Sequence, residues 1–331
     1  MRALWCDHWT DYDALTIQEV PEPALRPGTV RIRVESAGVS FATQLVVAGK
    51  YQRKPPLPFS PGTEISGTVL EAAPDVSGLA PGMRVFAVLD WGGSAEQAVV
   101  DAIHVVPLPE PLDLCAAPAL AISYPTAAGA LLWRGRLEPD QWVLVHGAGG
   151  GVGLAAVEIA KVLGARVIAR AGKAKHAGLL DRGADAVLDS AEPFRDEVRR
   201  ISGSGVALVL DLLGGPVFDD SLRCLGDGGM LLTVGYAAGG IPQVALNLLL
   251  LKNIGVAGFN WGSYVGWSPG DNRELYAPQV RALWGQLVRW WQERKIAPTV
   301  HAAYPLAEFR EAMTALRDRS AFGRIVLLPQ E

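Results

Sequence analysis

The stretch VLVHGAGGGVGLAAVEIA, residues Val143–Ala160, decides the fold of this chain. Five of the seven residues from Gly147 to Gly153 are glycine, and apolar residues stand on both sides of them. The apolar segments predict a buried strand over Val143–His146 and a helix over Leu154–Leu163. The glycines are therefore expected to form the turn between a strand and the helix that follows it.

A glycine turn that opens a helix is a typical place for a dinucleotide to bind. The free N–H groups and the dipole of the helix N-terminus favour the pyrophosphate, and a Cβ on the turn would hold the phosphate away. The spacing here is Ala148-x-Gly150-x-x-Gly153, with alanine in place of the first glycine of GxGxxG. The predicted cofactor contacts are Ala148, Gly149, Gly150, Gly151, Val152 and Gly153. A tight turn that binds no ligand is the alternative.

Strands and helices alternate through the middle of the chain. The apolar runs VLVHG, ARVIARAG, ALVLDLLGG and GMLLTVGY follow each other about 20 to 30 residues apart, with helical patterns between them. This alternation predicts an α/β fold with a doubly wound parallel sheet, whose strands are apolar throughout because both faces are buried. Such sheets bind ligands at the carboxyl ends of their strands. One strand ends at Val234, Gly235 and Tyr236, which are therefore predicted cofactor contacts.

The second strand of this series indicates which cofactor is bound. NAD is normally held by an acidic residue about 20 positions after the glycines. The strand ends at Ala171, 18 residues past Gly153, and has no acid there. Cations cluster instead, and they suit the 2′-phosphate of NADPH. The predicted contacts in this loop are Arg170, Gly172, Lys173 and Lys175, with a solvated basic loop as the alternative.

The two ends of the chain follow other patterns. Residues 1 to about 115 form short β-rich runs, three of which follow the turns Pro27–Gly28, Pro61–Gly62 and Pro81–Gly82. They predict a compact β-rich domain with a partly open barrel. After about Trp261 the pattern becomes helical, until GRIVLLP closes the chain as a strand. That strand is expected to pair with the N-terminal domain.

Composition excludes several classes of protein. The net charge of −4 gives no basic surface for nucleic acid. Three scattered cysteines fit neither a disulfide framework nor a metal pair, and the N-terminus has no apolar signal-peptide core, so a cytoplasmic setting is expected. The uncharged runs Leu114–Trp133 and Gly228–Leu251 contain proline and glycine. They predict short core elements joined by turns, and no membrane span.

Several segments in order along nearly the whole chain carry a family resemblance: GVSFATQLVVAGKY, FSPGTEISGTV, PTAAGALL, the glycine stretch, LDLLGG, LKNIGVAGFNWGSY and GRIVLLP. With them the sequence resembles the zinc-independent medium-chain dehydrogenases/reductases, in the NADPH:quinone oxidoreductase branch that includes zeta-crystallin. The resemblance implies a Rossmann NADPH-binding domain at residues 121–264 and a GroES-like, β-rich catalytic domain from residues 1–120 and 265–331. It also implies a homodimer joined edge to edge through the Rossmann sheets, with the edge strand lying within LLLLKNIGVAGFN.

Zinc-dependent relatives in this family hold a metal with a cysteine near residue 40 and a Gly-His-Glu motif. This chain has Ser40 at the first place and Pro61-Gly62-Thr63-Glu64 at the second, so the thiolate and imidazole ligands are missing. We therefore expect no metal. Without a Lewis acid, alcohol oxidation is disfavoured, and hydride transfer to a quinone or a conjugated enone is easier.

The resemblance also suggests roles for further residues. Thr126 matches a threonine near the nicotinamide, and Arg319 matches a basic residue that reaches the 2′-phosphate. Ser40 could hydrogen-bond the ribose or the substrate, and Tyr51 could donate a proton, so Ser40, Tyr51 and Thr126 are the candidate catalytic residues. The alternatives are that the serine lies at the surface, that the tyrosine only packs against its neighbours, and that the threonine only stabilises a turn. The segment whose backbone meets the carboxamide is matched by Gly258, Phe259 and Asn260.

The sequence departs from the family in the first domain, where polar residues of the family pattern are replaced by Ser40, Thr43, Leu45 and Val47. These changes predict a less polar, wider pocket. The leading hypothesis is an NADPH-dependent reductase of quinones or α,β-unsaturated carbonyls. The alternatives are a reductase of acryloyl or enoyl thioesters and a non-catalytic, crystallin-like NADPH-binding protein.

Overall fold

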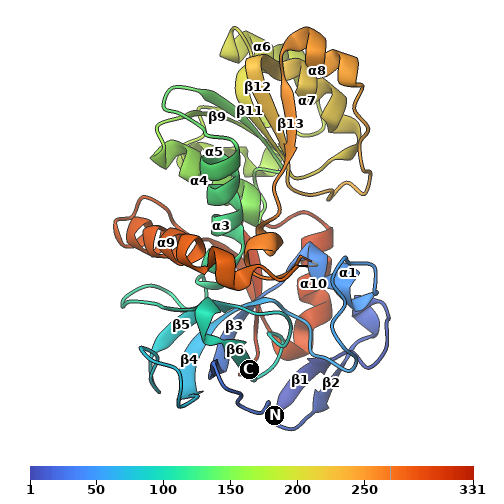
Figure 1. Cartoon of the computed structure of the whole chain (residues 1–331). Helices are drawn as coiled ribbons and strands as arrows, with labels where there is room; N and C mark the ends of the chain where they lie inside the picture. Colours follow the sequence, from blue (N-terminus) through green and yellow to red (C-terminus); the bar gives the residue numbers. More distant parts are fainter. Residues whose placement is uncertain (269) are drawn as a thin grey trace. The chain divides into compact units, whose positions relative to one another are not determined.

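The computed structural model describes residues 1–268 and 270–331 of the chain. The chain divides into two compact units (Figure 1). Unit 1 comprises Met1–Ile122, Gly262–Glu293 and Pro298–Glu331. Unit 2 comprises Ser123–Trp261 and Arg294–Ala297. The two ends of the chain thus build one unit together, and the middle of the chain builds the other.

Unit 2 contains a parallel six-stranded sheet with the strand order β10-β9-β8-β11-β12-β13. The chain runs from the central strand β8 outward to β9 and β10, and then crosses to β11 on the other side of β8. This reversal creates the switch point at which such sheets bind ligands, and it confirms the predicted doubly wound Rossmann sheet. The strands are β8 (Trp142–His146), β9 (Arg166–Ala171), β10 (Ala186–Asp189), β11 (Val206–Asp211), β12 (Leu225–Thr233) and β13 (Gly255–Gly258).

Helices cover both faces of this sheet. In Figure 1, α4 and α5 lie on one face, and α6, α7 and α8 lie on the other. The apolar side chains of Val143, Leu144 and Val145 in β8 are fully buried, as expected for a strand covered on both sides. The helices of unit 2 are α3 (Ser123–Ala128), followed by a π-helical turn (Gly129–Arg134), α4 (Gly151–Val162), α5 (His176–Asp181), α6 (Arg195–Ser202), α7 (Phe218–Cys224) and α8 (Leu246–Lys252).

One element of unit 2 begins earlier than the sequence predicts, and a second is shorter than the segment in which it was expected. Helix α4 begins at Gly151, three residues before the predicted start at Leu154, because the last glycines of the turn already form its first turn. The apolar run Leu248–Leu251 forms part of helix α8 and does not belong to the edge strand. The edge strand is the shorter β13 (Gly255–Gly258), which pairs only with β12 among the described strands.

Unit 1 contains a mostly antiparallel seven-stranded sheet with the order β14-β15-β3-β4-β5-β7, in which β6 also pairs with β3. A two-stranded sheet of β1 and β2 accompanies it. The strands are β1 (Arg2–Trp5), β2 (Thr16–Glu19), β3 (Thr29–Gly38), β4 (Glu64–Ala72), β5 (Arg84–Val88), β6 (Gln97–Asp101), β7 (Val105–Pro107), β14 (Val300–Pro305) and β15 (Arg324–Leu328). The helices are α1 (Phe41–Val47), α2 (Pro118–Ala121), α9 (Arg273–Gln292) and α10 (Phe309–Arg317).

Short 3₁₀ turns connect these elements, at Tyr12–Ala14, Ala102–His104, Lys173–Lys175, Gly215–Val217, Trp261–Tyr264 and Leu306–Glu308. The predicted proline–glycine turns are present, and Gly28, Gly62 and Gly82 all have positive φ. A residue with a Cβ is strained in that conformation, so the sequence needs glycine after each of these prolines.

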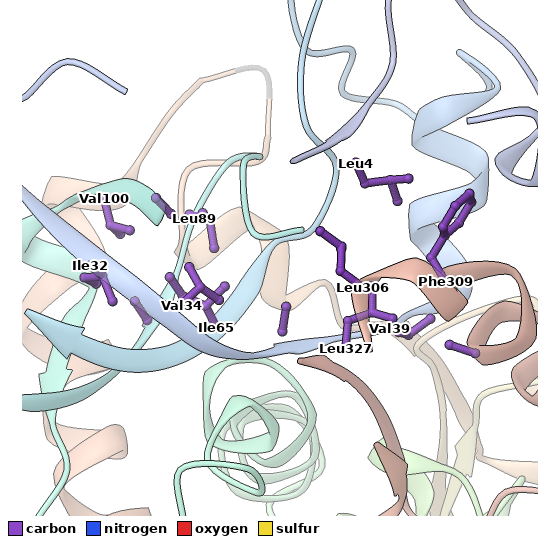
Figure 2. Close-up of a cluster of buried hydrophobic side chains, with 14 of the residues drawn as sticks. Leu4, Ile32, Val34, Val39, Ile65, Leu89, Val100, Leu306, Phe309 and Leu327 are labelled. Atoms are coloured by element: carbon purple, nitrogen blue, oxygen red, sulfur yellow. The ribbon is translucent and has the colours of Figure 1, made fainter. Parts of the chain in front are cut away.

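The core of unit 1 is drawn from both ends of the chain. Figure 2 shows Ile32, Val34 and Val100 of the N-terminal strands in one buried cluster with side chains from the C-terminal segment. The C-terminal members labelled there are Leu306, Phe309 and Leu327. Strand β15 pairs antiparallel with β3 through Val326–Gly38 and Leu327–Ala37, which confirms the predicted host of the closing strand.

The two long uncharged runs form short elements, as predicted. Leu114–Trp133 contains α2, α3 and most of the π-helical turn, and Gly228–Leu251 contains most of β12 and of α8. Among the described helices, none is long and apolar enough to cross a bilayer.

Candidate functional site

The glycine turn of unit 2 joins β8 to α4 and is tightly packed on one side. Gly147 has a φ of +66°, which favours glycine. A Cβ on Gly153 would collide with the carbonyl oxygen of Gly147, so this glycine allows the close approach of helix and turn. Ala148, which replaces the first glycine of the motif, is fully buried, and its N–H donates to the Arg170 carbonyl over 3.1 Å. The alanine thus fits inside the turn.

The other side of the turn is open. A Cβ on Gly150 would meet no atom closer than the Gly147 oxygen at 3.6 Å, which is an ordinary contact. Gly150 is the N-cap of the 12-residue helix α4 and offers no side chain to its N–H groups. Such a helix N-terminus attracts anions through its free N–H groups and its dipole. The arrangement fits a pyrophosphate held by the backbone of Gly150, Gly151 and Val152.

Lys175 is the cation that the structure places against this turn. Its side chain lies next to Gly149, where an added Cβ would overlap the Lys175 Cδ. Burial lowers the pKa of its ammonium group. Lys173 and Gly172 precede it in the exposed loop after β9. The loop thus places one lysine next to the glycine turn.

Arg170, which the sequence grouped with these lysines, is placed differently. It is 6% exposed, and its Nη2 donates to the carbonyls of Ser190 (2.6 Å) and Glu192 (3.1 Å). Its guanidinium also lies over the Phe194 ring, 4.5 Å from the centroid. Because β9 is a buried central strand, its last residues point into packed structure, and Arg170 ties β9 to the connection that follows β10.

The other predicted cofactor residues of unit 2 gather at the carboxyl ends of the parallel strands. Val234, Gly235 and Tyr236 follow β12, and the Val234 N–H donates to the Asp211 carbonyl over 2.9 Å. Gly258 ends β13, and Phe259 and Asn260 follow it. Parallel strands bring these segments to the same sheet edge as the glycine turn, as the sequence predicted.

Thr126 lies nearly buried in α3, which packs on α4. Its neighbour Tyr124 donates a hydrogen bond of 2.7 Å to Glu158 Oε2 of α4. Glu158 also accepts from Arg182 Nη1 (2.7 Å) and from the N–H of Ala297 (2.9 Å). Burial raises the pKa of the Glu158 carboxyl despite these partners. This hydrogen-bond network holds α3 against α4. In the sequence it is indicated by Glu158, the one acidic residue of the stretch Val143–Ala160.

His146, at the end of β8, is completely buried and its Nε2 lies 2.8 Å from Ser221 Oγ. Burial lowers its pKa to about 3. It is therefore a neutral core residue at working pH.

Unit 1 has a small cavity of about 30 Å³ that brings together two of the predicted catalytic residues. Ser40 and Tyr51 both line it. Ser40 is the N-cap of α1, and its Oγ lies 2.9 Å from Thr43 Oγ1. Burial raises the pKa of the Tyr51 phenol, so the phenol stays protonated at neutral pH. The other lining residues are Ala42, Thr43, Val46, Arg53, Pro55, Phe59, Pro61, Gly62, Thr63, Asp90, Trp91 and Trp267.

One wall of this cavity is charged. Asp90 is paired with Arg53, and it accepts from Arg273 Nη2 (3.2 and 3.1 Å) and from Trp267 Nε1 (3.2 Å). Burial opposes ionisation of Asp90, but the bonds and charges of Arg53 and Arg273 outweigh it and lower the pKa of the carboxyl. The sequence analysis missed this group because its members lie far apart in the chain, and only the fold brings them together.

Arg319 is an exposed residue of unit 1 with a φ of +54°, directly after the C-terminal end of α10. Its predicted contact with a 2′-phosphate stays a prediction. Ser40 and Thr63, which stand where zinc-dependent relatives have ligands, line the same cavity. Among the described residues, no group of three or more His, Cys, Asp or Glu side chains is arranged to hold a metal ion.

Comparisons with known proteins match both units. Residues 26–110 match the alcohol dehydrogenase GroES-like domain, and residues 151–277 match the zinc-binding dehydrogenase family. Quinone oxidoreductase-like protein 2 of Rattus norvegicus is 38% identical over 317 residues, which is 95% of this chain and 88% of that protein. The synaptic vesicle membrane protein VAT-1 homolog of Homo sapiens is 29% identical over 349 residues, covering 99% of this chain and 86% of that protein.

Among solved structures, mycobacterial Rv1454c complexed with NADPH superposes with a TM-score of 0.91 at 29% identity, covering 99% of this chain and 100% of that chain.

Proposed function

Since this chain belongs to the quinone oxidoreductase branch of the medium-chain dehydrogenases/reductases, we propose that it transfers hydride from NADPH to a quinone or an α,β-unsaturated carbonyl without a metal ion. The observation that carries the proposal is the glycine turn, open at Gly150 and flanked by Lys175. An oxidoreductase needs a cofactor, and this turn fits the phosphates of a dinucleotide.

The choice of NADPH rests on charge. The loop after β9 has Lys173 and Lys175 and has no acid at the strand end. An acid would bind the 2′-hydroxyl of NADH, whereas a lysine would bind the 2′-phosphate of NADPH. The NADPH complex of the structurally similar mycobacterial protein supports the same choice.

The carbonyl oxygen of the acceptor would enter the cavity of unit 1, because a volume of about 30 Å³ has room for one small polar group. NADPH supplies a hydride when bound, and the electrons displaced in the acceptor collect on its carbonyl oxygen. The phenol of Tyr51 stays protonated at neutral pH. It would therefore deliver a proton to the enolate of the reduced acceptor, either at the oxygen or at the α carbon. The hydroxyl pair of Ser40 and Thr43 would add hydrogen-bond donors and acceptors to the same wall.

Metal independence rests on residue chemistry. Ser40 and Thr63 stand where zinc would need a thiolate and an imidazole, and hydroxyl groups are poor ligands for zinc. Incubation with a strong chelator followed by gel filtration should leave turnover unchanged. Activity that disappears with stoichiometric zinc and returns on its addition would contradict this part of the proposal.

The proposed activity is tested by following NADPH absorbance with a panel of quinones, enones and one enoyl thioester. We expect turnover of quinones or enones, and faster turnover with NADPH than with NADH. Turnover of the thioester alone would mean that the acceptors are enoyl thioesters and not quinones or enones. NADPH binding without turnover of any member would favour a non-catalytic NADPH-binding protein, which is the second candidate because a fold does not determine activity.

We also propose a homodimer. The edge strand β13 leaves one side of its backbone unpaired within the described sheet, and an exposed edge favours pairing with another strand. Large apolar side chains near it are strongly exposed: Leu246 is 73%, Leu250 77% and Leu251 78% exposed. Exposed apolar surface of this kind marks interaction sites, and a second copy offers both a matching strand and a matching patch.

A further inference from the structure

Among the described residues that line the unit 1 cavity, Arg53 is the one with a positively charged side chain. Its guanidinium lies over the ring of Trp91, 5.5 Å from the centroid, and its Nη1 is bonded to Asp90 Oδ1. The side chain of Arg53 is 25% exposed. The charge is thus held in place at the cavity and is not surrounded by protein on every side.

Asp90 does not depend on Arg53. The carboxylate also accepts from Arg273 and from Trp267 Nε1, and Arg273 is itself anchored by Asp101 and Asp271. If Arg53 shifted toward a ligand, Asp90 would keep hydrogen-bond partners and would not become an unpaired buried charge. The bond to Asp90 uses Nη1, and a guanidinium has further N–H donors in the same plane.

We propose that Arg53 donates a hydrogen bond to the carbonyl oxygen of the acceptor and stabilises the negative charge that develops there. This inference rests on the proposed function. One hydride, which carries two electrons, would leave its carbon on NADPH, giving NADP⁺, and form a C–H bond to the acceptor. The π electrons of the acceptor would move to its oxygen, which becomes an enolate; with a quinone, a proton shift from the ring carbon to oxygen then gives the hydroquinone. A proton from Tyr51 or water then neutralises the product.

The chemistry of the cavity favours Arg53 for this task. Ser40 and Thr43 are neutral hydroxyls, and one O–H of the pair is used in their mutual hydrogen bond, so only the other O–H remains to donate to a full negative charge. A guanidinium stays charged at every working pH and binds oxyanions strongly. Without a metal ion as Lewis acid, a preorganised cation is the usual alternative for stabilising a developing oxyanion. Asp90 and Trp91 would then act as positioning residues that orient Arg53.

The test compares Arg53→Gln and Arg53→Lys with Lys54→Gln, a matched control that removes the adjacent exposed charge outside the cavity. We expect Arg53→Gln to lower kcat/KM for the best quinone or enone on the order of 100-fold, mainly through kcat, as loss of an oxyanion donor does. Arg53→Lys should restore part of this loss. The Kd for NADPH should not change, and Lys54→Gln should resemble the parent.

An Arg53→Gln variant that binds NADPH and keeps kcat/KM within about threefold of the parent would overturn the role of Arg53 and leave the proposed function intact. If Arg53→Gln does not fold, Arg53→Lys decides, and full activity in that variant has the same meaning.

If the parent itself turns over no acceptor, the proposed function fails, and a binding measurement then decides the role of Arg53. The probe is 4-nitrophenolate, an anionic oxygen on an aromatic ring, added to the protein with NADP⁺ and followed by its absorbance. Binding to the parent with loss in Arg53→Gln, but not in Lys54→Gln, would support the oxyanion site. Equal binding to all variants, or binding to none of them, would overturn it.

Discussion

Two glycines of the same turn have opposite structural roles, and this contrast gives a sharp test at the scale of a single residue. Replacing Gly150 by valine should abolish NADPH binding and leave a folded protein, because its Cβ has room but the side chain would fill the place of the pyrophosphate. The backbone of Gly150, with φ −89° and ψ 173°, also suits a β-branched residue. The Kd for NADPH and the melting temperature of the apo protein measure both effects.

The matched control is Gly153→Val. Its Cβ would collide with the Gly147 oxygen, so this variant should unfold at a clearly lower temperature even without cofactor. If Gly150→Val binds NADPH as tightly as the parent, the glycine turn does not hold the phosphates.

Lys175 allows the cofactor preference to be tested separately. Removing its ammonium group in Lys175→Ala should weaken NADPH binding about 10- to 100-fold, since a charge-assisted hydrogen bond contributes roughly 1.5–3 kcal/mol. NADH lacks the 2′-phosphate, so its binding to the same variant should hardly change and is the internal control. Fluorescence titration with both cofactors gives the ratio of affinities. Equal weakening for the two cofactors would mean that Lys175 contacts another part of the dinucleotide.

At the scale of elements, strand β8 makes the stability of unit 2 dependent on pH. Folding lowers the pKa of His146 to about 3, because burial excludes its charged form. The unfolded chain takes up a proton near pH 6.5, whereas the folded chain does not, so stability present above pH 6.5 is lost as the pH falls toward 3. Between pH 6.5 and 5 the loss should be about 2 kcal/mol.

Denaturant unfolding at pH 7.5 and 5.0 measures this loss, with His146→Leu as the control. In that variant the Ser221 hydroxyl keeps its hydrogen bond to the Val217 carbonyl, so the substitution should leave no buried hydroxyl without a partner. The variant should lose less stability on acidification than the parent by about the same 2 kcal/mol. An identical pH dependence in both proteins would assign the acid sensitivity to other groups, such as the buried His104 of unit 1, whose pKa burial lowers to about 4.

The elements themselves could largely be predicted from the sequence. Continuous apolar runs identified β8, β9, β11 and β12 of the parallel sheet, but β10 has no such run because its side chains are only half buried. The start of α4 differs from the prediction because glycine is a poor helix former, and only the packing of the turn compensates for it. The edge strand β13 lies within the predicted segment, but the sequence does not show that the first residues of this segment, Leu248–Leu251, belong to helix α8.

At the scale of the whole molecule, the sequence predicts the geometry of the glycine turn better than that of the unit 1 cavity. The glycine turn is contiguous in the chain, so its spacing alone indicates its chemistry. The charged wall of the cavity contains Arg53, Asp90 and Trp267, with Arg273 bonded to Asp90 behind it, and these segments meet only after folding. Arg170 stands at the expected position, but its guanidinium is bonded to a backbone carbonyl, and the sequence could not show this.

The proposed homodimer is tested at this scale by the double substitution Leu250→Glu and Leu251→Glu. Two charges placed in an apolar interface should give a folded monomer, because a buried unpaired carboxylate costs several kcal/mol. Light scattering after gel filtration measures the mass, and Lys295→Glu, at a different exposed position, is the charge-matched control. A parent that elutes as a monomer, or a double variant that remains a dimer, would contradict this interface.

The pairing of β15 with β3 has a consequence for synthesis on the ribosome. Strand β3 emerges almost 300 residues before its neighbour β15, whereas the sheet of unit 2 is encoded within Ser123–Trp261 and can form earlier. A nonsense codon just upstream of Arg324 would therefore release a polypeptide with an intact unit 2 and an open edge on β3. Open edges recruit other strands, so such truncated products should aggregate and become clients of chaperones and proteases.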